Sequence, residues 1–92
     1  MAWATARHIL VKSKEKCEAL KKEIDDGADF KTLAMENSDC PSGVSGGSLG
    51  QFSPGQMVPA FDQVVFNGDV GVVYGPVVTQ FGFHIIEITG RG

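Results

Sequence analysis

Cysteine, long apolar runs and positive charge are all scarce in this sequence of 92 residues. The two cysteines, Cys17 and Cys40, form no C-x-x-C pair, so we interpret them as free thiols in a reducing compartment. No apolar run approaches the roughly 20 residues that a membrane-spanning helix needs, and residues 1–8 lack the pattern of an export signal. We therefore expect no membrane partner and a cytoplasmic location, or an organellar one if a targeting segment was removed.

Basic residues are too few for a protein that binds the phosphate backbone of a nucleic acid. Asp and Glu number 11 against 8 Lys and Arg, which gives a net charge of −3, whereas such a protein needs a basic face. The glycine- and serine-rich segment 38–50 contains no Lys or Arg and lacks the phosphate-binding motif G-x-x-x-x-G-K-[ST]. With only two histidines and two cysteines, a zinc site is not expected. We predict no metal, no cofactor and no nucleic-acid partner.

Capping residues and apolar periodicity predict a small α+β domain. Ser13, Asp29 and Pro59 suit the first positions of three helices, while Gly27 and Gly68 suit the ends of two of them. Apolar segments predict strands over 5–12, 49–52, 71–79 and 83–88. This order is typical of an α+β fold with a mostly antiparallel sheet, which we expect as one domain over residues 1–92.

The chain has two histidines, His8 and His84, and each stands where an apolar strand begins. If the first and last strands pair, the two side chains come to lie side by side. That pairing would be the first indication of a functional site. The alternative interpretation is that each histidine is a core residue with local hydrogen bonds.

Cys40 and a set of apolar residues complete the candidate groups. A thiolate beside a histidine is a nucleophile, so a thiol hydrolase is one interpretation of Cys40, but no nucleophile motif surrounds it and a proline follows directly. Met57, Phe61 and Phe81 stand at the ends of predicted elements, where side chains tend to line a cleft; plain core packing is the alternative. Cys17 falls on an apolar stripe of the first helix and is expected in the core.

Four blocks of the sequence are distinctive: HILVK from His8, GGSLG from Gly46, GQMVPAF from Gly55, and GPVVTQFGFHII from Gly75. In their order and spacing, which cover nearly the whole chain, they resemble the parvulin family of peptidyl-prolyl cis/trans isomerases. The resemblance implies a parvulin/FKBP-like fold, a four-stranded antiparallel sheet surrounded by about four helices in the order βαααβαββ. The first and last strands would be adjacent in the middle of that sheet.

The resemblance also implies a set of catalytic residues. His8 and His84 would form a hydrogen-bonded pair at the floor of the site, and Thr79 would join the hydrogen bonds around them. Cys40 matches the position that faces the substrate peptide bond. No covalent intermediate is needed, because the implied reaction is a rotation about the X–Pro bond.

A second set of residues matches the substrate pocket of the family. Leu49, Met57 and Phe61 would surround the proline ring, and Phe81 matches a pocket-side position that varies between members. The implied partners are proline-containing peptides or unfolded protein clients, which a monomer would help to fold. The alternative is a non-catalytic proline-peptide-binding or chaperone module.

Phosphate recognition is not expected. Members of the family that act on phosphorylated substrates carry clustered Arg and Lys after the first strand, whereas here segment 12–17 has no Arg, contains Glu15 and runs straight into a predicted helix. A doubly charged phosphate favours bidentate Arg partners. We therefore predict a preference for apolar or uncharged residues before the proline.

Overall fold

The computed structural model describes residues 2–92, and its elements follow the expected order βαααβαββ. They are β1 (Ala4–Val11), α1 (Lys14–Asp25), α2 (Phe30–Asn37), η1 (Pro41–Ser45), β2 (Ser48–Phe52), α3 (Pro59–Asn67), β3 (Val73–Thr79) and β4 (Gly82–Arg91). The third helix, η1, is a short 3₁₀-helix within the segment that the sequence suggests is a loop. The predicted α+β fold with four antiparallel strands is confirmed.

The α-helices begin where their capping residues predict. The Ser13 hydroxyl accepts a hydrogen bond from the N–H of Lys16 (3.2 Å), which satisfies one of the free donors at the start of α1. The Asp29 carboxylate accepts from the hydroxyl and the N–H of Thr32 (2.7 and 3.1 Å), and these bonds hold the pKa of Asp29 below its usual value. Pro59 occupies the first turn of α3, where its missing N–H costs nothing.

The strand order of the sheet is β2-β1-β4-β3, so the first and last strands of the chain lie side by side in its middle. Their register places Leu10 opposite His84, and His8 opposite Ile86. Because side chains alternate between the faces of a sheet, His8 and His84 project from the same face as diagonal neighbours. The sequence-based expectation that these strands pair is confirmed.

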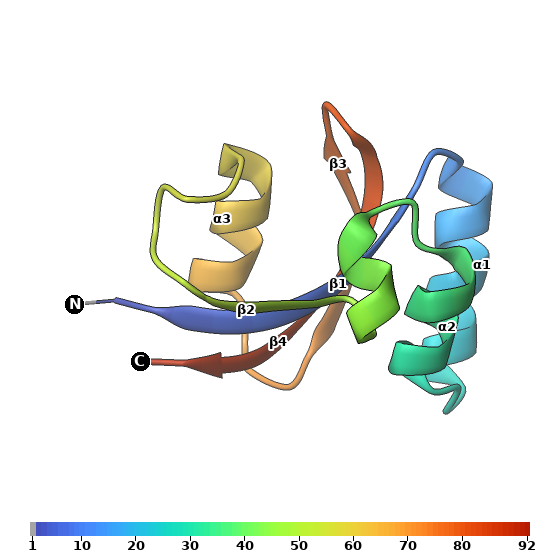
Figure 1. The fold of residues 1–92 in the computed structure, drawn as a ribbon, viewed down its shortest axis with the longest axis horizontal. Coiled ribbons are helices and arrows are strands. Elements are labelled where there is room, and N and C mark those ends of the chain that lie inside the picture. Colours follow the sequence, from blue (N-terminus) through green and yellow to red (C-terminus); the bar gives the residue numbers. More distant parts are fainter. Residues whose placement is uncertain (1) are drawn as a thin grey trace.

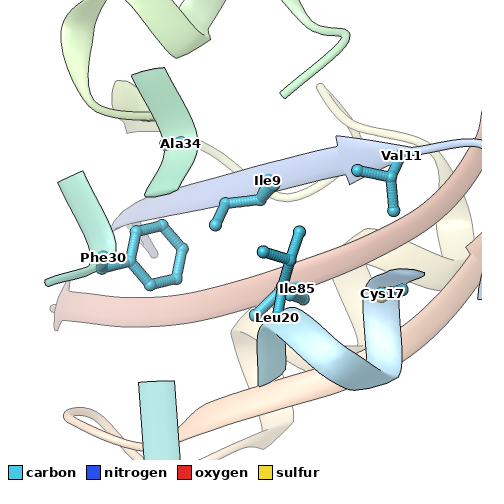
Figure 2. Packing of buried hydrophobic residues seen from close by; sticks show 7 residues of the cluster. All are labelled: Ile9, Val11, Cys17, Leu20, Phe30, Ala34 and Ile85. Atoms are coloured by element: carbon cyan, nitrogen blue, oxygen red, sulfur yellow. The ribbon is translucent and has the colours of Figure 1, made fainter. Parts of the chain in front are cut away.

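Apolar clusters cover both faces of the sheet, with α1 and α2 on one face and α3 on the other (Figure 1). Figure 2 shows the cluster under α1 and α2, which is made of Ile9, Val11, Cys17, Leu20, Phe30, Ala34 and Ile85. The cluster under α3 is made of Ala4, Ala6, Phe52, Phe61, Val65 and Ile86. The face that carries the histidines is therefore the α3 face.

The central pair of strands is the best-buried part of the fold. Ile9, Ile85, Ile86 and Ile88 are completely buried, and each contributes about 1.5–3 kcal/mol relative to an exposed side chain. Cys17 is buried in the α1 stripe, as predicted, and this burial raises the pKa of its thiol to about 11. The two histidines thus stand on strands that a packed core holds on both sides.

Gly47 brings the glycine-rich segment into direct contact with β1. Its carbonyl oxygen accepts a hydrogen bond from the N–H of His8 (3.0 Å), and its φ of +87° lies in the region that favours glycine. A side chain at this position would place its Cβ 2.3 Å from the carbonyl oxygen of His8. The backbone of Gly47 therefore helps to hold His8 in place.

We predict that Gly47→Ala destabilises the domain more than Gly50→Ala does. Both residues have positive φ, +87° and +69°, which costs an alanine about 1–2 kcal/mol, but no atom of residues 2–92 lies within 4 Å of a Cβ at Gly50. The contact with His8 should cost Gly47→Ala about 1–3 kcal/mol more. Urea unfolding at pH 7 measures both losses, and equal losses would show that the contact carries no energetic weight.

Candidate active site

A cavity of about 600 Å³ opens on the α3 face of the sheet. This size falls within the range of about 300–1,000 Å³ that is usual for ligand sites. The cavity is lined by residues from β1, η1, β2, α3, β4 and the loops between elements: His8, Leu10, Asp39, Cys40, Pro41, Leu49, Gln56, Met57, Val58, Phe61, Phe81 and His84.

Seven of the eight residues that the resemblance assigns to the site line this cavity. The eighth, Thr79, contacts the lining residue His84, with its Oγ1 2.7 Å from Nε2 of that histidine. The structure thus brings all eight into one place, and their individual roles in substrate binding and catalysis stay predictions.

The two histidines contact each other directly. Nδ1 of His8 lies 3.0 Å from Nδ1 of His84, and the rings are 15° from parallel, with centroids 5.2 Å apart. Both side chains are almost completely buried, with 5% and 4% of their surface exposed. The ring of Phe61 meets both imidazoles edge-on, at centroid distances of 5.6 and 5.8 Å. The pair therefore forms a desolvated floor beneath an aromatic wall.

A chain of hydrogen bonds continues from His8 to the thiol of Cys40. The Ser42 hydroxyl donates to Sγ of Cys40 (3.3 Å) and lies 3.1 Å from Nε2 of His8. Because a hydroxyl has only one proton to donate, Ser42 must accept from Nε2–H of His8. A neutral His8 is then bare at Nδ1, where it accepts from Nδ1–H of His84.

The same reasoning applies on the other side of the pair. A neutral His84 that donates through Nδ1 is bare at Nε2, and it accepts there from the hydroxyl of Thr79. The Thr79 oxygen in turn accepts from the N–H of Phe81 (3.1 Å). Every ring nitrogen has a partner when both histidines are neutral, so the network needs no charge.

Burial favours the same neutral state. Desolvation, together with the nearby His84, lowers the pKa of His8 from 6.5 to about 4. Desolvation also lowers the pKa of His84. At neutral pH the cavity therefore presents an uncharged, hydrogen-bonded pair rather than a cation.

Apolar side chains form the remaining walls. Leu49, Met57 and Val58 pack beside Phe61 on the α3-face core, so one side of each belongs to the core and another lines the cavity. The two interpretations left open for Met57 and Phe61, core and cleft, therefore both hold. Phe81 is 55% exposed and stands at the mouth of the cavity.

Several residues of the site escape sequence reasoning. Ser42 is the link between His8 and Cys40, and the only signal for it is its place two residues after Cys40 in a turn-rich segment. Asp62 in the first turn of α3 accepts a hydrogen bond from the N–H of Gly55 (2.6 Å) and so anchors the loop that carries Met57. The signal for Asp62 in the sequence is weak: an acidic residue in the first turn of a predicted helix, seven positions after Gly55.

Residues 2–92 contain no group of three or more His, Cys, Asp and Glu side chains arranged to hold a metal ion. The absence of a metal or cofactor from the function stays a prediction. None of the helices in this same part of the chain has the length and apolarity that a bilayer crossing requires.

Comparison with known proteins identifies the family. The family model described as the PPIC-type PPIASE domain matches residues 3–92. The chain belongs to this family. The resemblance to parvulins is thereby confirmed for the PPIC-type domain, whose family is that of the peptidyl-prolyl cis/trans isomerases.

Relatives of the PPIC-type domain include both longer and equally short chains. The present chain is 44% identical over 87 residues to the foldase protein PrsA of Geobacillus kaustophilus, and this match covers 94% of the present chain but 31% of PrsA. The crystal structure of the PrsA peptidylprolyl isomerase from Bacillus anthracis is 37% identical, with a TM-score of 0.95 over 99% of this chain and 42% of that one. The chain thus spans about a third of the length of the curated relatives it matches.

A third relative matches from end to end. The solution structure of NmPin, the parvulin of Nitrosopumilus maritimus, is 35% identical and covers 98% of both chains, with a TM-score of 0.86. A domain of this length is therefore a known form of the parvulin fold.

We predict that the stability of the PPIC-type domain falls as the pH drops from about 6.5 to 4. Between these pH values His8 is protonated in the unfolded chain but stays neutral in the folded chain. The contribution of neutral His8 to the free energy of unfolding is therefore fully present above pH 6.5 and is lost toward pH 4. The loss from this histidine is on the order of 3 kcal/mol. Urea unfolding at several pH values measures it, and His8→Asn removes the group while other titrations continue. An unchanged pH dependence in His8→Asn would contradict the prediction.

Proposed function

We propose that this domain rotates X–Pro bonds in peptides and unfolded protein clients by a non-covalent mechanism that requires no phosphate. The observation that carries the proposal is the cavity itself, an apolar pocket whose floor is a neutral histidine pair and whose lining includes one thiol. The name foldase, which the Geobacillus relative bears, supports protein clients as substrates.

The reaction requires little covalent chemistry from the protein. Resonance in the amide opposes rotation with a barrier of about 18–20 kcal/mol. The planar amide is polar because resonance separates charge, and the twisted transition state loses this separation. An apolar pocket therefore disfavours the planar state more than the twisted one, since burying polar groups without partners is costly.

Different walls of the cavity suit different parts of the substrate. Leu49, Met57 and Phe61 offer an apolar surface for the proline ring, and a held ring lets the preceding carbonyl rotate against it. We assign to Cys40 a polar contact near that carbonyl. The histidine pair keeps the shape and protonation of the floor, because its hydrogen bonds are complete without charge.

The charges around the cavity oppose phosphate binding. Among residues 2–92, no lysine or arginine lines the cavity, and Lys12, Lys14 and Lys16 are exposed outside it. A phosphate carries about −1.5 to −2 charge at pH 7 and would find no cationic partner at the walls. An uncharged residue before the proline therefore fits this surface better than a phosphorylated one does.

Two other functions make different predictions. A non-catalytic peptide-binding or chaperone module would bind the same peptides without accelerating the rotation. A thiol hydrolase would need Cys40 as a nucleophile. Among residues 2–92, the hydrogen bonds of the Cys40 sulfur lead to His8 through Ser42, and no base contacts the sulfur directly. A cytoplasmic location and a monomeric state stay predictions.

We predict that the domain accelerates cis/trans isomerisation of a short peptide with alanine before proline, in proportion to protein concentration. Replacing alanine by serine should change the rate little, and replacing it by phosphoserine should slow it. A proline isomerisation assay with these peptides checks both statements. A rate equal to the spontaneous one would favour the binding module, and a tenfold faster turnover of the phosphoserine peptide would overturn the phosphate-independent mechanism.

We predict that Cys40→Ser retains most of the turnover, because serine preserves a hydrogen-bonding group in the same place. Loss of one net hydrogen bond of about 1–1.5 kcal/mol in Cys40→Ala corresponds to about a tenfold lower kcat/KM. Intact-mass measurement of wild type mixed with peptide should reveal no adduct. If an adduct forms, it should lie on Cys40, because Cys17 is buried and serves as the unreactive internal control. A trapped adduct together with an inactive Cys40→Ser would establish a covalent route instead.

A further inference from the structure

Asp39 is a cavity residue to which neither the resemblance nor the mechanism assigns a role. It lies between α2 and η1, next to Cys40, and its side chain is exposed at the lining of the cavity. Its N–H donates to the carbonyl oxygen of Leu10 in β1 (2.7 Å), so the backbone that carries the carboxylate is tied to the sheet. The backbone that carries this charge therefore has a defined place at the site.

The fold does not use this carboxylate. The neighbouring Ser38 fastens the loop, since its hydroxyl accepts hydrogen bonds from the N–H of Leu10 (3.0 Å) and from the N–H of Cys40 (3.3 Å). In the described part of the chain, the Asp39 carboxylate makes neither a hydrogen bond nor an ion pair with another side chain. The residue is exposed and lines the cavity, so its charge can interact with solvent and with an occupant of the cavity.

Asp39 also dominates the electrostatics of the cavity. Of the residues in the described part of the chain that line it, Asp39 is the one carboxylate, and none is Lys or Arg. The histidines at the floor are neutral in the hydrogen-bond network described above. An occupant therefore meets one uncompensated negative charge, close to Cys40, where the peptide bond lies in the proposed mechanism.

We propose that Asp39 is a specificity-determining residue that favours substrates with Lys or Arg directly before the proline and disfavours those with Asp or Glu. The proposal rests on the proposed binding of X–Pro peptides and adds the sign of the charge that the site selects. It departs from the sequence-based prediction of apolar or uncharged residues before the proline, because the sequence alone does not place Asp39 at the cavity. Because Asp39 is exposed, the expected effect is moderate, about two- to tenfold between a lysine and a glutamate peptide. Salt should reduce it, since exposed charges are screened within about 8–10 Å at ionic strengths of 0.1–0.15 M.

The test uses three peptides that differ only in the residue before proline, which is Lys, Ala or Glu. For each peptide, kcat/KM comes from the isomerisation assay and Kd from a titration followed by NMR, at low and high salt. The variants are Asp39→Asn and the matched control Asp26→Asn. Asp26 is an exposed carboxylate at the end of α1, which packs on the opposite face of the sheet.

In wild type, kcat/KM should be highest for the Lys peptide, lower for the Ala peptide and lowest for the Glu peptide. Asp39→Asn should bring the ratio of kcat/KM between the Lys and Glu peptides close to one, and Asp26→Asn should retain the wild-type ratio. An unchanged ratio in Asp39→Asn, or an equal fall in both variants, would overturn the proposal; the second result would assign the preference to net charge. If no peptide is turned over, the proposed isomerase activity fails, while the Kd ratios still test Asp39. Equal Kd values for all three peptides in wild type would overturn the role of Asp39 alone.

Discussion

The register between β1 and β4 is the constraint on which the site depends. These strands come from opposite ends of the chain, and their pairing places the Nδ1 atoms of His8 and His84 3.0 Å apart. A slip of one residue in β1 would turn His8 to the α1 and α2 face and would remove Ile9 from the cluster in which it packs there. Complete burial of Ile9, Ile85 and Ile86 on alternating faces excludes such a slip, so the core and the site are specified by the same pairing.

The neutral histidine pair explains why hydroxyl groups stand at both of its ends. A buried ring nitrogen without a partner costs about 1–3 kcal/mol, and two rings that share one hydrogen bond leave two further nitrogens to satisfy. Ser42 and Thr79 satisfy these two. The result is a polar but uncharged floor, which can contact an amide without presenting a charge to it. Such a floor suits a reaction whose transition state is less polar than its ground state.

Sequence reasoning predicts the scaffold better than the loops because local patterns encode the scaffold. Ser13, Asp29 and Pro59 predict the starts of three helices, and alternating apolar residues predict the strands that carry the histidines. Without the family resemblance, however, the pairing of the two histidines is only one of two interpretations. The path of segment 38–50 is set by contacts far away in the sequence, such as Gly47 against His8, and propensity does not foresee them.

The site divides into a buried floor and an exposed rim, and the two parts have different physical roles. His8 and His84 stand on central strands between buried isoleucines, where small displacements are costly. Asp39 and Phe81 are exposed on connecting segments, where a substitution changes few core contacts. Thr79 and Phe81 lie two residues apart on one turn, yet the first contacts the floor and the second stands at the mouth. Because the hydrogen bond between them joins rim to floor, substrate selection can vary at the rim while the geometry of the floor is retained.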